Sequence, residues 1–121
     1  MKRVMIVDDD DDVCLTMQIA LGAYGYGVVV AHDGAEALHA LEVSEPPCLI
    51  ILDLMMPGMN GQQFRAAQLR DAALAAIPVV VLSGDYKVSE RAAVLGVEGI
   101  SKPIDLPDLL AKVGQFCGPA T

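Results

Sequence analysis

Basic residues are scarce in this sequence. Lysine and arginine together number 8 against 16 aspartate and glutamate residues, which gives a formal net charge of −8. The basic residues are scattered and form no stripe, so they offer no surface for nucleic-acid phosphates or anionic lipids. We therefore expect neither nucleic acid nor a membrane among the direct partners, whereas an acidic surface suits a divalent cation.

Long apolar runs are also missing, and none approaches the length needed to span a bilayer. Met1-Lys2-Arg3 has the charge of a signal-peptide start. However, the run of consecutive acids that begins at Asp8 excludes the apolar segment such a peptide requires. We expect a cytoplasmic location.

Cysteine is sparse and shows no ligand pattern. Cys14, Cys48 and Cys117 are odd in number, and their spacing matches neither CxxC nor a zinc-binding arrangement. We expect all three to be buried free thiols in a reducing compartment, without a catalytic role.

The remaining composition predicts one folded domain. The chain has 121 residues, of which 54% are hydrophobic, so it is long and apolar enough to build a core and does not read as disordered. No linker or repeat divides it. We expect a single stand-alone domain over residues 1–121, with a core over about 2–117 and a short tail over 118–121.

Short apolar runs alternate five times with helical patterns. Predicted strands cover 4–7, 28–31, 48–52, 77–82 and 100–101, and a helix follows each; the third helix runs from Gly61 to about Leu74. Asp33, Asp85 and Asp105 stand where N-caps are expected, and Glu36 completes the spacing of a capping box with Asp33. This alternation predicts an α/β fold, a doubly wound (βα)5 parallel sheet with helices on both faces. We expect the strand order 2-1-3-4-5.

Polar residues follow four of the five predicted strands. Asp8 and Asp9 follow the first strand, Asp53 the third, Ser83 the fourth and Lys102 the fifth. The carboxyl ends of parallel strands lie at one edge of the sheet, where ligands of such folds bind. We expect these five side chains to form one site.

The residue types in this predicted site suit phosphoryl transfer. Clustered carboxylates repel one another unless a hard cation such as Mg²⁺ lies among them. Lys102 adds a positive charge, Ser83 a hydroxyl donor and Asp53 a nucleophilic carboxylate. Each residue alone also has an ordinary explanation as a cap, a turn residue or a surface charge, but their coincidence at four strand exits favours a site.

With these motifs the chain resembles the receiver domain of two-component response regulators, over about Lys2 to Phe116. The resemblance is carried by the following motifs: Asp8-Asp9, Asp53 followed by Leu-Met-Met-Pro-Gly-Met-Asn-Gly, Ser83, and Lys102-Pro103. It implies a flavodoxin-like fold and a signalling domain that catalyses only its own phosphorylation and dephosphorylation, not an enzyme acting on other substrates.

The resemblance also implies residue roles. Asp53 would accept a phosphoryl group from a sensor histidine kinase or a histidine phosphotransfer protein. Asp8, Asp9, Asp53 and the backbone carbonyl of Met55 would hold Mg²⁺, or alternatively Mn²⁺. Lys102 and Ser83 would contact the phosphoryl oxygens, and the Lys102-Pro103 bond would be cis.

Phosphorylation would then repack a surface made by the helix after Asp85, the fifth strand and the helix after Asp105, and so alter binding of a downstream target. Receivers usually carry an aromatic residue near the fifth strand, but residues 98–102 contain none. The segment 96–102 is one residue short of the family pattern, and Tyr86 lies at a different point in the motif. We expect Ile100 or a loop movement to transmit the signal, and Met55 and Asp85 to tune the lifetime of the acyl phosphate.

Three other functions share parts of this pattern. A flavin carrier would need a Ser/Thr/Gly-rich loop after the first strand, where the aspartates here would repel the cofactor phosphate. An aspartyl phosphatase would normally need a second Asp at the position of Met55. The stronger alternative is a degenerate receiver that binds proteins independently of phosphorylation; the complete set Asp8, Asp9, Asp53, Ser83 and Lys102 disfavours it.

Overall fold

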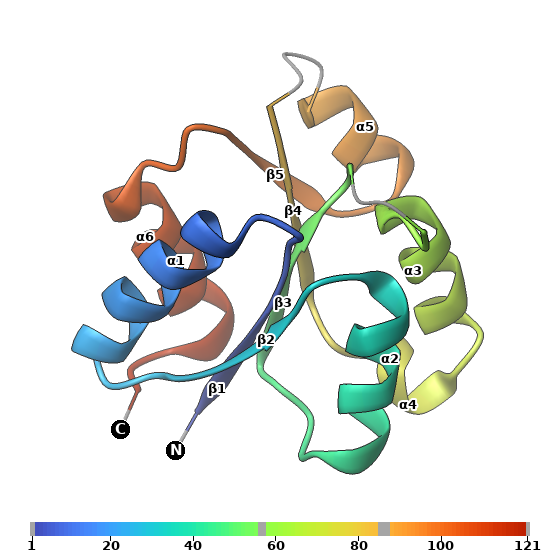
Figure 1. The fold of residues 1–121 in the computed structure, drawn as a ribbon, viewed down its shortest axis with the longest axis horizontal. Coiled ribbons are helices and arrows are strands. Elements are labelled where there is room, and N and C mark those ends of the chain that lie inside the picture. The colour runs from blue at the N-terminus through green and yellow to red at the C-terminus, as the bar shows by residue number, and fades with distance from the viewer. Residues whose placement is uncertain (1, 56–57, 85–87, 121) are drawn as a thin grey trace.

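The computed structural model describes residues 2–55, 58–84 and 88–120, which form five strands and six helices (Figure 1). The strands are β1 (Arg3–Val7), β2 (Gly27–Ala31), β3 (Leu49–Asp53), β4 (Val79–Ser83) and β5 (Glu98–Ser101). The helices are α1 (Asp11–Ala23), α2 (Gly34–Val43), α3 (Gly61–Leu69), α4 (Ala72–Ala75), α5 (Val88–Val94) and α6 (Leu106–Cys117).

All strand pairings are parallel, and the order is β2-β1-β3-β4-β5. The register aligns Ile6 with Ile51 and Ile51 with Val80, so the three central strands lie level with one another. The predicted fold class and strand order are confirmed. Both faces of these strands are covered, which explains why their sequences are apolar without alternation.

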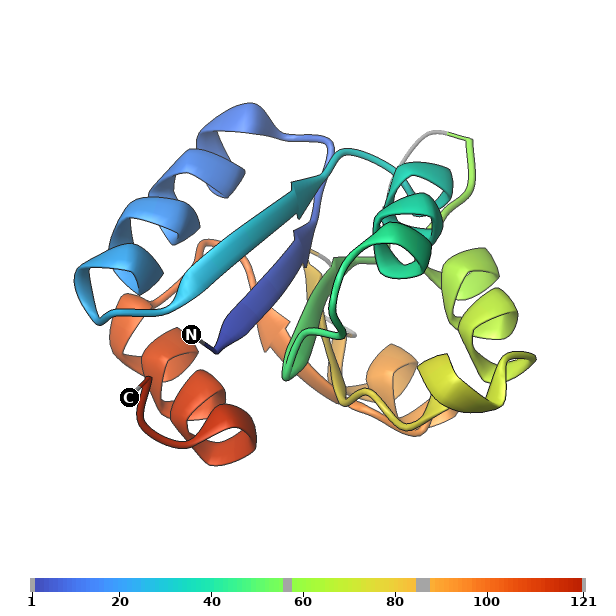
Figure 2. The ribbon, with the colours of Figure 1, turned by 90° about the horizontal axis from the view of Figure 1, so that it is seen from below.

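Two groups of helices cover the two faces of the sheet (Figures 1 and 2). Helices α1 and α6 pack on the face formed by Val4, Ile6, Leu49, Ile51, Val80 and Leu82. Helices α2 to α5 lie on the other face, with Met5, Val7, Ile50, Leu52, Val79 and Val81. Fully buried anchors such as Met17 of α1 and Phe64 of α3 each contribute roughly 1.5–3 kcal/mol by leaving water.

The predicted third helix is too long. Helix α3 ends at Leu69, and a separate short helix, α4, follows it. The side chain of Asp71 accepts a hydrogen bond from the Ala73 amide and begins α4. The buried Gln68 amide donates to the carbonyls of Leu74 and Ile77, and so stabilises the turn between α4 and β4. A propensity for helix through this alanine-rich stretch is therefore overridden by local side-chain hydrogen bonds.

Two of the three predicted caps lie in the described part of the chain. Asp33 accepts from the Glu36 amide, and Asp105 from the Asp108 amide, as expected. The capping box at Asp33 is not closed, since the Glu36 carboxylate lies instead against the His32 ring at 3.3 Å. Asp85 lies outside the described residues.

The expectation of three free thiols is wrong for two of them. Cys48 and Cys117 form a disulfide with their Cα atoms 5.4 Å apart, and only Cys14 is free and buried. Cys48 directly precedes the central strand β3, and Cys117 ends α6, which packs against that strand. The two cysteines are 69 positions apart, so only the fold brings them together.

No helix in the described part of the chain combines the length and the apolar character needed to cross a bilayer.

Candidate functional site

Asp53 is the last residue of β3 and is only 3% exposed. Its Oδ1 accepts a hydrogen bond of 3.0 Å from the Met55 amide, and its Oδ2 lies 3.5 Å from Lys102 Nζ. The strand leaves the sheet immediately afterwards, where the Leu54 amide donates to the Leu82 carbonyl. The carboxylate is therefore held at the carboxyl edge of the sheet.

Gly61 at the start of α3 packs directly on the backbone around Asp53. A Cβ atom at this position would lie 2.8 Å from Leu54 Cα and 2.9 Å from the Asp53 carbonyl oxygen. Only glycine permits this approach, so Gly61 helps to fix the loop beyond Asp53.

Asp8 and Asp9 come from the adjacent strand β1. Asp8 is fully buried; its Oδ1 accepts from the Asp10 amide at 2.9 Å and its Oδ2 lies 3.0 Å from Lys102 Nζ. Asp9 is exposed. One carboxylate oxygen from each of Asp8, Asp9 and Asp53 can be chosen so that all three lie within 4.8 Å of one another.

Lys102 and Ser83 complete the site from the other side. Ser83 is the buried last residue of β4, directly after Leu82, which pairs with Asp53. The Lys102 amide donates to the Ser83 carbonyl at 2.9 Å, which fixes the residue after β5 against the end of β4. The Lys102-Pro103 bond is cis, as expected from the resemblance.

The charges of this site depend on its burial. Burial raises the pKa of Asp53 to about 6, helped by the negative charge of Asp8 and opposed by the Met55 amide and Lys102. Burial alone would lower the pKa of Lys102, but its hydrogen bonds and charge interactions with Asp8 and Asp53 raise it above the ordinary value. At neutral pH a nucleophilic carboxylate and an ammonium group therefore lie side by side.

The donor set fits a hard divalent cation. Three carboxylates converge on one edge and a single ammonium group partly offsets their charge, which leaves net negative charge around oxygen ligands of the kind Mg²⁺ prefers. Asp8, Asp9 and Asp53 could hold the ion. The Met55 amide is turned to Asp53, and its carbonyl stays a predicted ligand.

The run of aspartates also contains a helix cap that the sequence analysis did not predict. Asp10 is the N-cap of α1, accepting from the amides of Asp12 and Val13. Its place just before a helical pattern is the signal that could have identified it. Behind Asp8, the Cys14 thiol lies 3.3 Å from the Asp8 carbonyl oxygen. Burial first, and then the neighbouring carboxylates, raise the Cys14 pKa to about 11, so this thiol stays protonated.

A parallel sheet of this order with an aspartate cluster and a lysine at its carboxyl edge defines a class of signalling domain. The family model described as the response regulator receiver domain matches residues 4–114. The chain belongs to this family.

Proteins similar to this chain include response regulators known from their sequences and from solved structures. The chain is 38% identical over 114 residues to the response regulator MprA of Mycobacterium avium, an alignment that covers 92% of this chain and 49% of that protein. A putative response regulator from Chloroflexus aurantiacus superposes with a TM-score of 0.87 at 26% identity, covering 95% of this chain and 96% of the other. The chemotaxis protein CheY4 of Vibrio cholerae gives a TM-score of 0.85 at 27% identity, covering 96% and 98%. The chain spans about half the length of the curated relatives it matches.

Proposed function

We propose that Asp53 is the phospho-acceptor of this receiver domain and takes a phosphoryl group from a phosphohistidine of a sensor kinase or a histidine phosphotransfer protein. An Asp53 carboxylate oxygen forms the new P–O bond while the P–N bond to the donor histidine breaks. The electron pair stays on the imidazole nitrogen, which then takes up a proton. The observation that carries this proposal is the buried Asp53 carboxylate, 3.5 Å from Lys102 Nζ and clustered with Asp8 and Asp9.

The residues around Asp53 have separate tasks in this step. Lys102 balances the charge that collects on the phosphoryl oxygens, and the Ser83 hydroxyl donates to one of them. Asp8 keeps Lys102 in place through its 3.0 Å contact. When bound between Asp8, Asp9 and Asp53, Mg²⁺ supplies further neutralisation of the same oxygens; Mn²⁺ has suitable oxygen chemistry too.

Intact-mass analysis after incubation with acetyl phosphate tests this function. We expect the wild-type domain to gain one phosphoryl group with Mg²⁺ and none with a chelator. Asp53→Asn should gain none under either condition. Asp71→Asn is the matched control, because it removes the same charge at an exposed helix cap where asparagine serves equally well. Phosphorylation of Asp53→Asn to the wild-type extent would refute the assignment, and a domain that takes up no phosphoryl group would favour the degenerate alternative.

Ile100 is our proposed transmitter of the phosphorylation signal. It is 8% exposed, belongs to the core on the α1/α6 face and pairs with Leu82, the residue before Ser83. A movement of Ser83 towards the phosphoryl group would therefore change the packing of Ile100. The surface of α5, β5 and α6 would then repack and bind a target protein. Ile100→Ala should weaken the coupling between phosphorylation and target binding. Equal coupling in wild type and Ile100→Ala would assign the signal to a loop movement. Tyr86, and Asp85 with its predicted effect on the acyl-phosphate lifetime, lie outside the described residues.

We propose α1 as the docking surface for the histidine-bearing partner. Leu15 and Ile19 are 55% and 64% exposed and lie one helical turn apart on this helix, whose first turn follows Asp9 and Asp10. An exposed apolar pair on the helix that follows the aspartates of the site is a candidate contact for a protein partner. Ile19→Asp should slow transfer from the kinase and leave labelling by acetyl phosphate unchanged. Val43→Asp, at a similarly exposed position on α2, is the control.

We also propose that the domain acts in the cytoplasm, as a phosphorylation switch and not as an enzyme on other substrates.

A further inference from the structure

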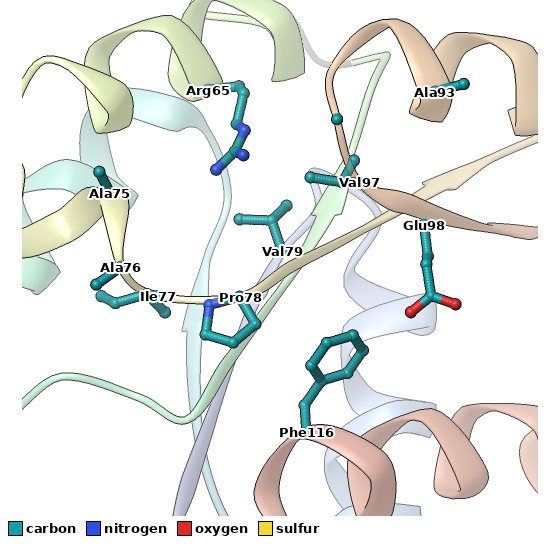
Figure 3. Close-up of a pocket in the computed structure, with 11 residues that line it drawn as sticks. Arg65, Ala75, Ala76, Ile77, Pro78, Val79, Ala93, Val97, Glu98 and Phe116 are labelled. Carbon is teal, nitrogen blue, oxygen red and sulfur yellow. The ribbon is translucent and has the colours of Figure 1, made fainter.

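A cavity of about 480 Å³ opens at the amino edge of the sheet, at the opposite end of the strands from Asp53 (Figure 3). Several separate parts of the fold form its wall. The lining residues that matter here are Arg65 of α3, Ile77 and Pro78 ahead of β4, Val97 and Glu98 at the start of β5, and Phe116 of α6. The volume lies within the range of sites that bind small molecules.

Arg65 brings an unbalanced positive charge to this cavity. Within the described part of the chain its guanidinium group makes one hydrogen bond, from Nη1 to Gln68 Oε1 at 2.8 Å. Its Nε is buried and has no hydrogen-bond partner, and among the described residues no carboxylate forms an ion pair with it. Burial lowers the Arg65 pKa below its ordinary value, the sign of a cation held in poorly solvated surroundings. The guanidinium therefore has few acceptors in the protein, and the N–H groups that Gln68 does not use can donate to an anion in the cavity.

The guanidinium is held in place before any ligand arrives. Gln68 accepts from Arg65 and donates to the carbonyls of Leu74 in α4 and of Ile77, which lines the cavity. Gln68 is fully buried, so its side chain is fixed before a ligand binds. Such preorganisation lowers the cost of binding.

The opposite side of the cavity limits the charge of the ligand. Figure 3 shows the Glu98 carboxylate beside Phe116. Glu98 forms an ion pair with Lys112, so this lysine is not free to bind a second anionic group of a ligand. The Glu98 carboxylate itself would repel such a group at short range. Pro78, Val97 and Phe116 offer apolar surface between the two charged ends.

We propose that this cavity binds a small organic monocarboxylate, with its carboxylate on the Arg65 guanidinium and its hydrocarbon body against Pro78, Val97 and Phe116. The guanidinium N–H groups that Gln68 leaves unused match a carboxylate, and the apolar walls favour an organic acid over inorganic phosphate. The site does not depend on phosphorylation of Asp53, so either proposal can fail without the other.

Benzoate is the probe for this site, because it combines one carboxylate with a flat apolar ring. We expect titration into the ¹⁵N-labelled domain to shift the amides of Gly96, Val97 and Val79 saturably, with a dissociation constant in the millimolar range or tighter. Benzamide, which has the same shape without the charge, should bind at least tenfold more weakly, since a charge-assisted hydrogen bond is roughly twice as strong as a neutral one. Inorganic phosphate should leave these amides unchanged.

Two variants separate this site from non-specific binding. Arg65→Gln should weaken benzoate binding at least tenfold, whereas Arg70→Gln, which removes an exposed arginine at the end of the same helix, should bind like wild type. Val97→Phe keeps Arg65 but fills the cavity, and should also abolish the shifts; it serves if Arg65→Gln fails to fold. Equal binding of benzoate and benzamide, unchanged affinity in both cavity variants, or the absence of saturable shifts would overturn the proposal.

Discussion

Replacing Asp53 by asparagine should stabilise the metal-free domain, and by an amount that depends on pH. Burial raises the folded-state pKa of Asp53 from 3.8 to about 6, so the unfolded chain releases this proton before the folded chain does. The free energy of unfolding therefore has its full value, as far as this group is concerned, below about pH 4, and it falls as the pH rises through 6. With 1.36 kcal/mol for each pKa unit, the loss above pH 7 is on the order of 3 kcal/mol. Asparagine does not titrate and avoids this loss.

Urea denaturation in a chelating buffer between pH 4 and 8 measures this effect. The difference in unfolding free energy between Asp53→Asn and wild type should be near zero at pH 4 and rise to its full value by pH 7. Asp71→Asn, at the exposed N-cap of α4, should show no such rise. A difference that stays constant with pH, or a variant less stable than wild type at pH 8, would refute the claim that ionised Asp53 is costly without a metal.

Four further predictions address the metal, the lysine, the glycine beside Asp53 and the disulfide. Millimolar Mg²⁺ should raise the unfolding temperature of wild type and not of Asp53→Asn, because a ligand stabilises only the state that binds it; equal shifts in thermal melts would contradict a site at Asp53. Lys102→Met should slow phosphorylation by acetyl phosphate on the order of a hundredfold, as loss of a positioned charge does elsewhere, and time-resolved mass analysis would show a wild-type rate if the reasoning is wrong. Gly61→Ala should destabilise by about 1–3 kcal/mol through the 2.8 Å clash with Leu54 Cα. Gly22→Ala, inside α1 with open space around it, should stabilise by about 0.5–1 kcal/mol, and urea denaturation compares the two. Cys117→Ser should lower the unfolding free energy by up to about 4 kcal/mol, because the disulfide closes a loop of 69 positions; wild type with a reducing agent should match it, and a variant as stable as oxidised wild type would contradict the prediction.

The predictions that came from strand patterns agree best with the structure. Runs such as residues 4–7 and 49–52 are apolar on both faces because both are covered, so their sequence alone indicates parallel strands. Where the chain depends on individual hydrogen bonds the patterns failed. The break between α3 and α4 depends on Asp71 and the buried Gln68, whose contacts no periodicity reveals.

For the site, the sequence determined which residues could take part, since Asp8, Asp9, Asp53, Ser83 and Lys102 each follow an apolar strand and parallel strands end at a common edge. Only the tertiary structure decided the distances between them: the contacts of Lys102 with both Asp8 and Asp53, and the depth that raises the pKa of Asp53. The Cys48–Cys117 bond and the cavity at Arg65 were likewise decided only by the fold. The physical reason is the same in each case. Local sequence sets which conformations a segment prefers. Hydrogen bonds, ion pairs and disulfides form only between groups a few ångströms apart, so they depend on how distant segments pack.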